Sequence, residues 1–243
     1  MKRFLTLITL LFLSTISIPA QLDGKQAGDL SPVEKGGVYG YADGTGKIVI
    51  KPQFELAYKF SEDLALVRIN RKFGFIDRSG RFVIASQYGQ ATSFSEGLAS
   101  VATGAYPGKW GYIDKTGKLT IPMQYDYALD FADGLAAVKV GEYWGYIDKS
   151  GHTLISPQFS NAGKFSEGLA PVSFEGKWGY IDKTGKTIIA PQFDGAAPFV
   201  NGTAKVGFGS NCDHCADIGD PTAYLETIKY IDKAGQYVDP PSH

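Results

Sequence analysis

The stretch Lys109-Trp110-Gly111-Tyr112-Ile113-Asp114-Lys115-Thr116-Gly117-Lys118 decides the fold, because it returns along the chain at a nearly fixed interval of about 34 residues. Residues 177–186 repeat it letter for letter, 143–148 are a close copy, and 73–77 and 39–43 are weaker copies. A period of this size predicts a repeat architecture, in which each unit completes its hydrophobic core on its neighbours.

The N-terminus predicts export. Lys2 and Arg3 precede an apolar run from Phe4 to Ile18, and Pro19-Ala20 offers a small residue for cleavage before Gln21. This pattern is typical of a secretory signal peptide over 1–20, followed by a linker over 21–29. The alternative is an uncleaved N-terminal anchor. We therefore expect a secreted or periplasmic protein with no membrane contact beyond the signal segment.

The charge balance is modest and argues against two classes of partner. Loss of Lys2 and Arg3 leaves 24 − 2 = 22 basic groups against 25 acidic ones, a net charge of −3. Binding to nucleic acid or to an anionic membrane requires a basic field that this composition does not supply. We expect neither partner.

Six units follow the linker and fill residues 30–243, with starts near 30, 64, 98, 135, 169 and 203. Each unit opens with an apolar-rich stretch such as 135–140, continues with the Trp-Gly-Tyr-Ile-Asp segment, and ends with a run such as 187–189. Short strands joined by tight turns predict an all-β fold of six tandem three-stranded antiparallel meanders. The last unit carries an insertion over 207–226.

The turn after the second strand reads Asp-x-x-Gly in all six units. Asp can accept a hydrogen bond from a backbone N–H two residues on, and Gly supplies the positive φ of a bulged type I turn. A carboxylate in every unit also suggests calcium binding or acid–base chemistry, but the turn explains both residues at once. The best copies are Asp114 with Gly117, Asp148 with Gly151 and Asp182 with Gly185.

The Trp-Gly pairs are also assigned a structural role. Gly weakens a strand unless another group must come close at that point, and we expect an aromatic ring from an adjoining segment to lie over it. The alternative is a row of aromatics that stacks on carbohydrate. The pairs are Trp110-Gly111, Trp144-Gly145 and Trp178-Gly179.

The connector between units has regular aromatics. Tyr125, Ala128 and Phe131 stand three residues apart, and the other units repeat the spacing. Spacing of i, i+3, i+6 predicts a single helical or 3₁₀ turn that plugs the gap between adjacent meanders.

The chain resembles the WG-repeat (KWG) family of bacterial, often exported, β-rich repeat proteins. The resemblance covers about residues 30–241 and rests on the Lys-Trp-Gly-Tyr-Ile-Asp segment together with the Pro-Gln-Phe and Phe-Ser-Glu-Gly-Leu-Ala elements. It implies a repeat protein that binds other molecules, and it carries over no catalytic residue.

The two ends depart from the family pattern. The first unit has Tyr39-Gly40 in place of Trp-Gly, and the sixth has Ile228-Lys229-Tyr230. Terminal units that differ from the rest are what an open stack needs to cap its ends. We therefore favour an open curved array over a closed six-bladed, propeller-like ring.

The insertion holds both cysteines of the chain. In an exported protein the favoured interpretation is a disulfide between Cys212 and Cys215. The alternatives are a redox-active pair, two free thiols, and a metal site formed by Cys212, His214, Cys215 and Asp217.

No catalytic motif stands out, so we expect no enzyme, no catalytic residue and no cofactor. His152 replaces a Lys or Arg of other units, and Glu62, Glu96 and Glu167 lie in turns where a solvated role is expected. The leading hypothesis is a scaffold that binds a protein partner. The alternatives are glycan or peptidoglycan binding through Tyr106, Tyr127 and Tyr143 and, as a minor one, a hydrolase.

Overall fold

The computed structural model describes residues 29–104, 108–210, 222 and 225–241. The described residues form strands and turns without a helix. No helix in this part of the chain is therefore long and apolar enough to cross a membrane. The predicted all-β class is confirmed.

The strands form six separate antiparallel sheets, numbered here from 1 to 6 in chain order. Sheet 1 consists of β1 (Ser31–Lys35), β2 (Val38–Ala42) and β3 (Ile48–Phe54). Sheet 2 consists of β4 (Leu56–Ser61), β5 (Leu64–Ile69), β6 (Lys72–Ile76) and β7 (Phe82–Tyr88). Sheet 3 consists of β8 (Gln90–Ala91), β9 (Leu98–Ala102), β10 (Trp110–Asp114) and β11 (Leu119–Tyr125).

Sheets 4 to 6 repeat the four-stranded order. Sheet 4 consists of β12 (Tyr127–Ala128), β13 (Leu135–Val140), β14 (Tyr143–Asp148) and β15 (Thr153–Phe159). Sheet 5 consists of β16 (Asn161–Ala162), β17 (Leu169–Phe174), β18 (Lys177–Asp182) and β19 (Thr187–Phe193). Sheet 6 consists of β20 (Gly195–Ala196), β21 (Thr203–Ser210), β22 (Leu225–Asp232) and β23 (Tyr237–Val238).

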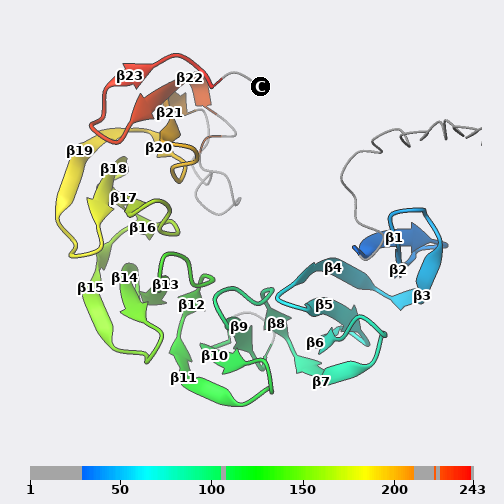
Figure 1. Ribbon diagram of the computed structural model, residues 1–243. Coiled ribbons are helices and arrows are strands. Elements are labelled where there is room, and N and C mark those ends of the chain that lie inside the picture. The colour runs from blue at the N-terminus through cyan, green and yellow to red at the C-terminus, as the bar shows by residue number, and fades with distance from the viewer. Residues whose placement is uncertain (1–28, 105–107, 211–221, 223–224, 242–243) are drawn as a thin grey trace, which may run out of the picture.

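Figure 1 shows the sheets side by side along an open arc. The connector strands β4, β8, β12, β16 and β20 lie on its inner side, and the last strand of each sheet lies on the outer side. The ends of the arc do not meet. The open array expected from the atypical end units is confirmed.

The prediction for the connectors was wrong in detail. Each connector forms a strand instead of a helical turn and adds a fourth strand to the three-stranded meander that follows. In sheet 4, Ala128 pairs with Val138, and Leu129 N–H donates to Ala137 O at 2.9 Å. Strand pairing satisfies the backbone groups that an isolated helical turn would leave unpaired.

Tight turns close these inner hairpins. Glu96 and Gly97 both have positive φ, at 54° and 88°. This is the type I′ geometry that suits the right-handed twist of a two-residue hairpin. The corresponding turns of the other sheets also have positive φ at their central residues.

Five hydrophobic clusters fill the spaces between the six sheets. Each inner sheet buries both faces: Tyr112 belongs to the cluster shared with sheet 4, and Ile113 to the one shared with sheet 2. On the side facing its predecessor, every sheet from 2 to 6 presents an Ala, a Val and an Ile. In sheet 3 these residues are Ala99, Val101 and Ile113.

The two end faces have polar or small residues at some of the positions where the inner sheets are apolar. Sheet 1 has Ser31 and Ala42 where sheet 3 has Ala99 and Ile113. Sheet 6 has Thr203 where sheet 5 has Leu169 and Lys205 where it has Pro171, and Val238 pairs with Tyr230 as Ile189 pairs with Tyr180. These replacements reduce the apolar character of the outermost sheets, as the ends of an open stack require.

The Trp-Gly pair is structural, but its reason differs from the one expected. A Cβ on Gly111 would lie 2.5 Å from the Ile121 carbonyl oxygen and 2.8 Å from the Met123 nitrogen. The neighbour that requires glycine is thus the bulged backbone of β11, where an aromatic ring was expected. Trp110 and Trp178 are buried, and Trp144 is half-buried.

Candidate interaction surfaces

The Asp-x-x-Gly turns have the geometry expected from the sequence. Asp114 Oδ1 accepts hydrogen bonds from Thr116 N–H at 2.9 Å, Thr116 Oγ1 at 2.6 Å and Lys118 N–H at 3.1 Å. Gly117 N–H donates to the Asp114 carbonyl, and Gly117 has φ +86°. The Thr116 hydroxyl is the main cause that lowers the pKa of Asp114. This carboxylate is therefore engaged in its own turn.

Acidic residues in the inner hairpin turns join consecutive sheets, a role that the sequence analysis did not indicate. Glu62 accepts hydrogen bonds from Gly97 N–H at 3.0 Å and from Lys115 Nζ at 3.1 Å, and both donors belong to the next sheet. Glu96 and Glu167 make equivalent contacts. The sequence holds a signal for these contacts, called clasps here, in the recurring acidic residue of the turn, but the glycine partner lies about one repeat away and the lysine partner more than 50 positions away.

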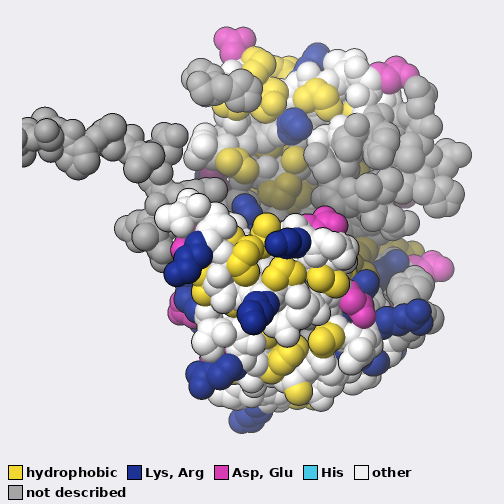
Figure 2. Space-filling view, turned by 90° about the vertical axis from the view of Figure 1, so that its right-hand side faces the viewer, with side chains coloured by type: hydrophobic (Ala, Val, Ile, Leu, Met, Phe, Trp, Pro, Cys, Tyr) yellow, Lys and Arg dark blue, Asp and Glu magenta, His cyan; other side chains and the backbone are white. Residues whose placement is uncertain are grey.

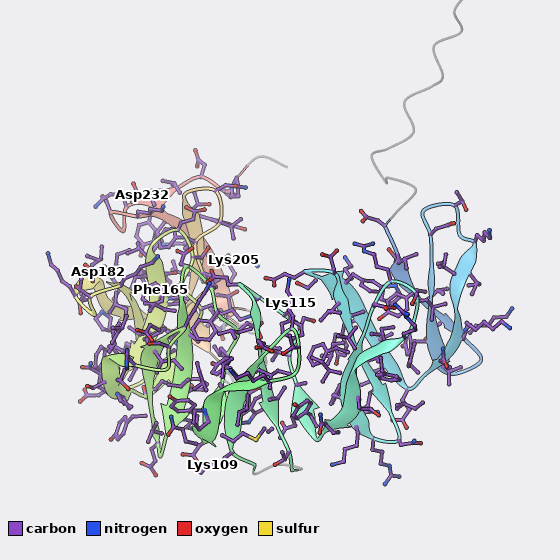
Figure 3. The ribbon with its side chains drawn as sticks, turned by 60° about the horizontal axis from the view of Figure 1, so that its bottom comes forward. Lys109, Lys115, Phe165, Asp182, Lys205 and Asp232 are labelled. Carbon is purple, nitrogen blue, oxygen red and sulfur yellow. The ribbon has the colours of Figure 1, made fainter. Side chains whose placement is uncertain are left out.

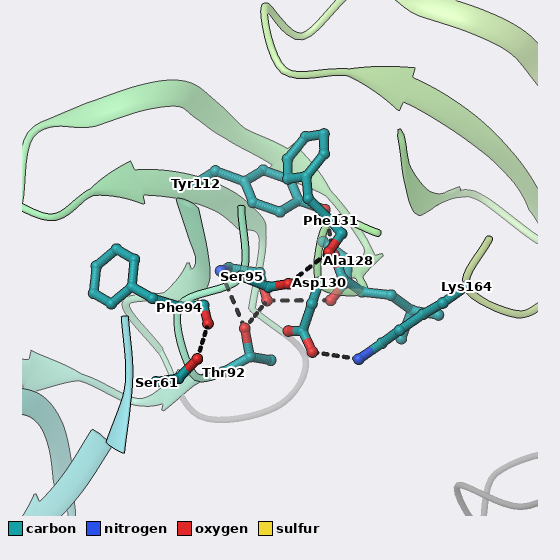
Figure 4. Close-up of polar contacts among 11 residues, drawn as sticks. Ser61, Thr92, Phe94, Ser95, Tyr112, Ala128, Asp130, Phe131 and Lys164 are labelled. Carbon is teal, nitrogen blue, oxygen red and sulfur yellow. Dashed lines mark hydrogen bonds and ion pairs between the residues drawn. The ribbon is translucent and has the colours of Figure 1, made fainter. Parts of the chain in front are cut away.

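Serine hydroxyls reinforce the same joints (Figure 4). Ser61 Oγ donates to the Phe94 carbonyl at 2.7 Å, and Ser95 Oγ donates to the Phe131 carbonyl at 2.8 Å. Sheet 4 has Ala132 at this position, and an ion pair between Asp130 and Lys164 links it to sheet 5. Charge-assisted and neutral hydrogen bonds therefore hold the sheets in a fixed relative arrangement.

The clasps and the Asp-x-x-Gly turns lie at one end of the strands. The turns between the two central strands of a sheet, such as the turn between β13 and β14, lie at the other end and are called hairpin tips here. Figure 3 shows Lys115, Asp182 and Asp232 at the turn side, with Lys109 on the opposite side. On the hairpin side Lys109 pairs with Asp126 at 2.6 Å, and Lys177 pairs with Asp194 at 2.5 Å.

The aromatic residues proposed for glycan stacking do not form one uniform row. Tyr127 lies between Trp110 and Trp144, with ring centroids 5.0 Å and 5.8 Å away, and is 37% exposed. Tyr143 is 51% exposed at the hairpin tip of sheet 4. Tyr106 lies outside the described residues. The buried Trp110 Nε1 has no hydrogen-bond partner among the described residues.

The outer strands carry a surface that the sequence analysis did not single out. Here it is called the outer rim, and it consists of the exposed apolar residues at the first two positions of these strands. The members are Ile48, Val49, Phe82, Val83, Leu119, Leu154, Ile188, Tyr237 and Val238. A clue is present in the sequence, because two apolar residues precede the buried Ile in sheets 1 and 2, and one apolar residue with a Thr precedes it in sheets 3 to 5.

The cysteine-containing insertion yields no site that can be evaluated. Cys212, His214, Cys215 and Asp217 lie outside the described residues, while β21 and β22 pair as far as Ser210 and Leu225. Within the described ranges, no group of three or more His, Cys, Asp and Glu side chains is placed to hold a metal ion.

Solved structures with a similar fold are distant in sequence. A eukaryotic initiation factor has a TM-score of 0.55 at 13% identity over 86% of this chain and 62% of its own. The dihydro-heme d1 dehydrogenase NirN has a TM-score of 0.55 at 12% identity over 88% and 53%. Hsv2 of Kluyveromyces lactis has a TM-score of 0.47 at 9% identity over 73% and 59%. The chain thus spans between 53% and 62% of the length of these structures.

The sequence comparisons identify the repeat itself. No curated protein matches the chain significantly. The family described as "WG containing repeat" matches it five times, over residues 39–73, 73–105, 110–144, 144–178 and 178–212. These matches cover more than half of the chain and begin at the aromatic-Gly pair of each unit. The chain belongs to the WG-containing repeat family.

Proposed function

We propose that this protein is an exported, non-enzymatic scaffold that binds a protein partner through its outer rim. The observation that carries the proposal is the recurrence of exposed apolar side chains at equivalent positions of the outer strands in all six sheets. Exposed apolar side chains that recur along a surface are typical of interaction sites. A rigid curved array presents such a surface over a long path.

The chemistry of the described carboxylates agrees with a scaffold. The Asp-x-x-Gly carboxylates accept hydrogen bonds from their own turns, and the clasp glutamates are bound to lysines of the next unit. Catalytic acids and bases need side chains whose lone pairs are available to a substrate. Export is proposed from the signal-like residues 1–20, and mass measurement of a mature N-terminus at Gln21 tests it.

Photocrosslinking with a matched pair of sites tests the binding surface. A photoreactive residue at Leu154, on the rim of sheet 4, is compared with one at Tyr143, on the hairpin side of the same sheet. The two side chains are 54% and 51% exposed. We expect a discrete protein adduct from position 154 and none from 143. An adduct from 143 alone would show that the rim is not the contact surface.

Glycan or peptidoglycan binding is the second candidate, and the exposed Tyr127 and Tyr143 beside Trp144 favour it. Aromatic faces of this kind offer apolar contact area to a sugar ring. Sedimentation with purified peptidoglycan tests it. Tyr143→Ala should release the protein from the pellet, whereas Tyr237→Ala, at a side chain of similar exposure, should not. Equal sedimentation of both variants would remove this candidate.

A further inference from the structure

We propose that strand β7 is the docking edge of the rim, where an extended segment of the protein partner adds to sheet 2 as a further strand. The inference rests on the proposed protein-binding function and names the strand and the chemistry of the bound segment. Strand addition is a common mode of peptide recognition, in which backbone hydrogen bonds provide affinity and side chains provide specificity.

Proline distinguishes β7 from the other outer strands. Three of them have Pro at the fifth position, β11 has it at the fourth, and β23 ends after two residues with Pro240 close behind. β7 has Ser86 at the fifth position and no proline along its length. The prolines are Pro52 in β3, Pro122 in β11, Pro157 in β15 and Pro191 in β19.

Proline on an edge strand blocks pairing with another chain, because it lacks an N–H and its ring occupies the edge. The structure describes all six outer strands. Five of them have a proline in or close to the strand, which protects the edge. β7 pairs only with β6 and keeps a backbone N–H at every position. No proline therefore blocks strand addition at this edge.

The backbone at Ser86 has the same geometry as at the prolines. The Ser86 nitrogen lies 2.7 Å from a Cβ built on Gly74. The Pro52, Pro157 and Pro191 nitrogens lie 2.6–2.7 Å from a Cβ built on the glycine of their own Trp-Gly-type pair. Since proline is accommodated there, β6 does not require the N–H of residue 86.

The side chains of β7 suit an apolar partner strand. Ile84 and Tyr88 are buried in the cluster shared with sheet 3 and hold the strand in place. Phe82 is 42% exposed, with its ring centroid 6.3 Å from that of Phe54 in sheet 1, and Val83 is 46% exposed, so two neighbouring positions present apolar side chains at the edge. A partner strand with aliphatic residues would cover them.

Cations flank this apolar edge. Arg81 is exposed directly before β7, and Lys47 and Lys118 are exposed at the equivalent positions of sheets 1 and 3. Arg81 pairs with Asp77, whereas the two lysine ammonium groups make no ion pair within the described residues. Figure 2 shows hydrophobic side chains interspersed with Lys and Arg on the face of this end of the arc. The complementary segment is an extended strand that combines aliphatic and acidic residues.

The test uses a fluorescent seven-residue peptide of alternating Val and Glu as the probe and anisotropy as the readout. Three forms of the full chain are compared: wild type, Ser86→Pro and Ser86→Ala. The alanine variant removes the hydroxyl but keeps the N–H, so its affinity should stay within about twofold of the wild type. The proline variant should weaken binding at least tenfold, which corresponds to about 1.4 kcal/mol.

Fold and location are measured in parallel. The melting temperature of Ser86→Pro should stay close to that of wild type, since the sister strands hold proline at this position. Hydrogen exchange of residues 82–87 should slow when the peptide is added to the wild type. Equal affinity of all three forms, no binding to the wild type, or protection confined to another strand would each overturn the assignment of β7.

Two further outcomes separate this inference from the scaffold proposal. If Ser86→Pro loses the peptide but keeps the Leu154 crosslink, the partner contacts the rim at several sheets and β7 remains one docking edge. If the wild type dimerises and Ser86→Pro does not, a second copy of the chain occupies β7, and a foreign partner strand is excluded. If no photoreactive residue on the outer rim gives a protein adduct in an otherwise wild-type chain, the scaffold proposal itself is contradicted.

Discussion

At the scale of single residues, the buried tyrosine of the Trp-Gly-Tyr segment bonds the second strand to the connector that follows. Tyr146 is fully buried, and its hydroxyl donates to the Gly163 carbonyl at 2.8 Å. Tyr41, Tyr112 and Tyr180 make the same bond to a carbonyl 17 residues further on. Burial raises the pKa of the Tyr146 hydroxyl well above its ordinary value, so it stays protonated as a donor. Sheet 2 has Phe75 at this position and lacks the bond.

Tyr146→Phe should lower the free energy of unfolding by about 1–2 kcal/mol, because the half-buried Gly163 carbonyl loses its donor. Phe75 shows that a phenyl ring fits the site. Urea denaturation measures the change, and Tyr143→Phe at the exposed hairpin tip is the control, with an expected change near zero. Equal stability of the two variants would mean that the Tyr146 hydroxyl bond contributes nothing net.

The turn before β5 has an unfavourable residue. Asp63 has φ +73°, whereas the equivalent residues of sheets 3 to 6 are glycines with φ from +80° to +88°. Asp63→Gly should raise the free energy of unfolding by up to about 1 kcal/mol, since relief of the left-handed strain exceeds the entropy cost of glycine. The lost pair with Arg78, at 3.6 Å, is exposed and contributes little.

Asp63→Ala is the matched control for that change, because alanine also removes the pair but keeps a Cβ. Thermal unfolding of the three proteins should rank Gly above Asp and Asp above Ala. If glycine ranks below aspartate, the φ value at residue 63 is not a source of strain.

The sequence could predict the Asp-x-x-Gly residues because their partners lie within four positions in the chain. Gly111 illustrates the limit of such reasoning. The sequence indicates that something must approach this glycine, but the group that does so is the β11 backbone, whose bulge depends on the pairing of Trp110 with Tyr125 and Tyr112 with Ile121.

At the scale of elements, the turns between the second and third strands make folding sensitive to acid. The hydrogen bond from Ser79 is the largest cause that lowers the pKa of Asp77 from 3.8 to about 2. The equivalent carboxyls Asp43, Asp114, Asp148 and Asp182 also have lowered pKa values, each chiefly through the hydroxyl two residues on. A carboxyl with a lower pKa in the folded state binds its proton more weakly there than in the unfolded state.

The contribution of these carboxyls to the free energy of unfolding should therefore be constant above about pH 5. It should fall as the pH drops from about 4 to 2. Urea midpoints measured across this range check the expectation. Asp77→Asn removes one of the contributing groups, so its curve should be shallower than that of the wild type. A steeper curve for the variant would contradict the sign of the pKa shift.

The connectors show why some elements escape prediction from sequence. Tyr125, Ala128 and Phe131 have helix-like spacing, yet Ala128 pairs with Val138 in a strand of two residues. So short a strand has no periodicity of its own, and its conformation depends on the sheet that receives it. The clasps are similar: Glu62 and Lys115 stand more than 50 positions apart in the chain, and only stacking of the sheets brings them together.

At the scale of the whole molecule, the five clusters between six sheets make stability a sum over neighbours. Removal of residues 135–168 joins Gly134 to Leu169 and takes away one complete period. Both flanking turns have a glycine before the strand, at Gly134 and Gly168, with φ +86° and +87°. The junction therefore retains the local geometry.

This deletion variant should fold as a shorter arc with lower stability, because it has four inter-sheet clusters instead of five. Small-angle scattering should show a smaller radius of gyration, and urea unfolding should show a lower midpoint and a smaller m-value. An aggregated or unfolded product would contradict independent stacking of the units. The wild-type scattering curve provides the control for the open arc itself.

The two end sheets described above also affect how the number of repeat units can change in evolution. Of the six described sheets, only the first and the last have a face without a neighbouring sheet. A repeat unit gained or lost between them therefore creates no further uncovered apolar face. Gene duplication can therefore lengthen or shorten the span of the protein, and the number of docking strands it offers, while both ends remain as they are.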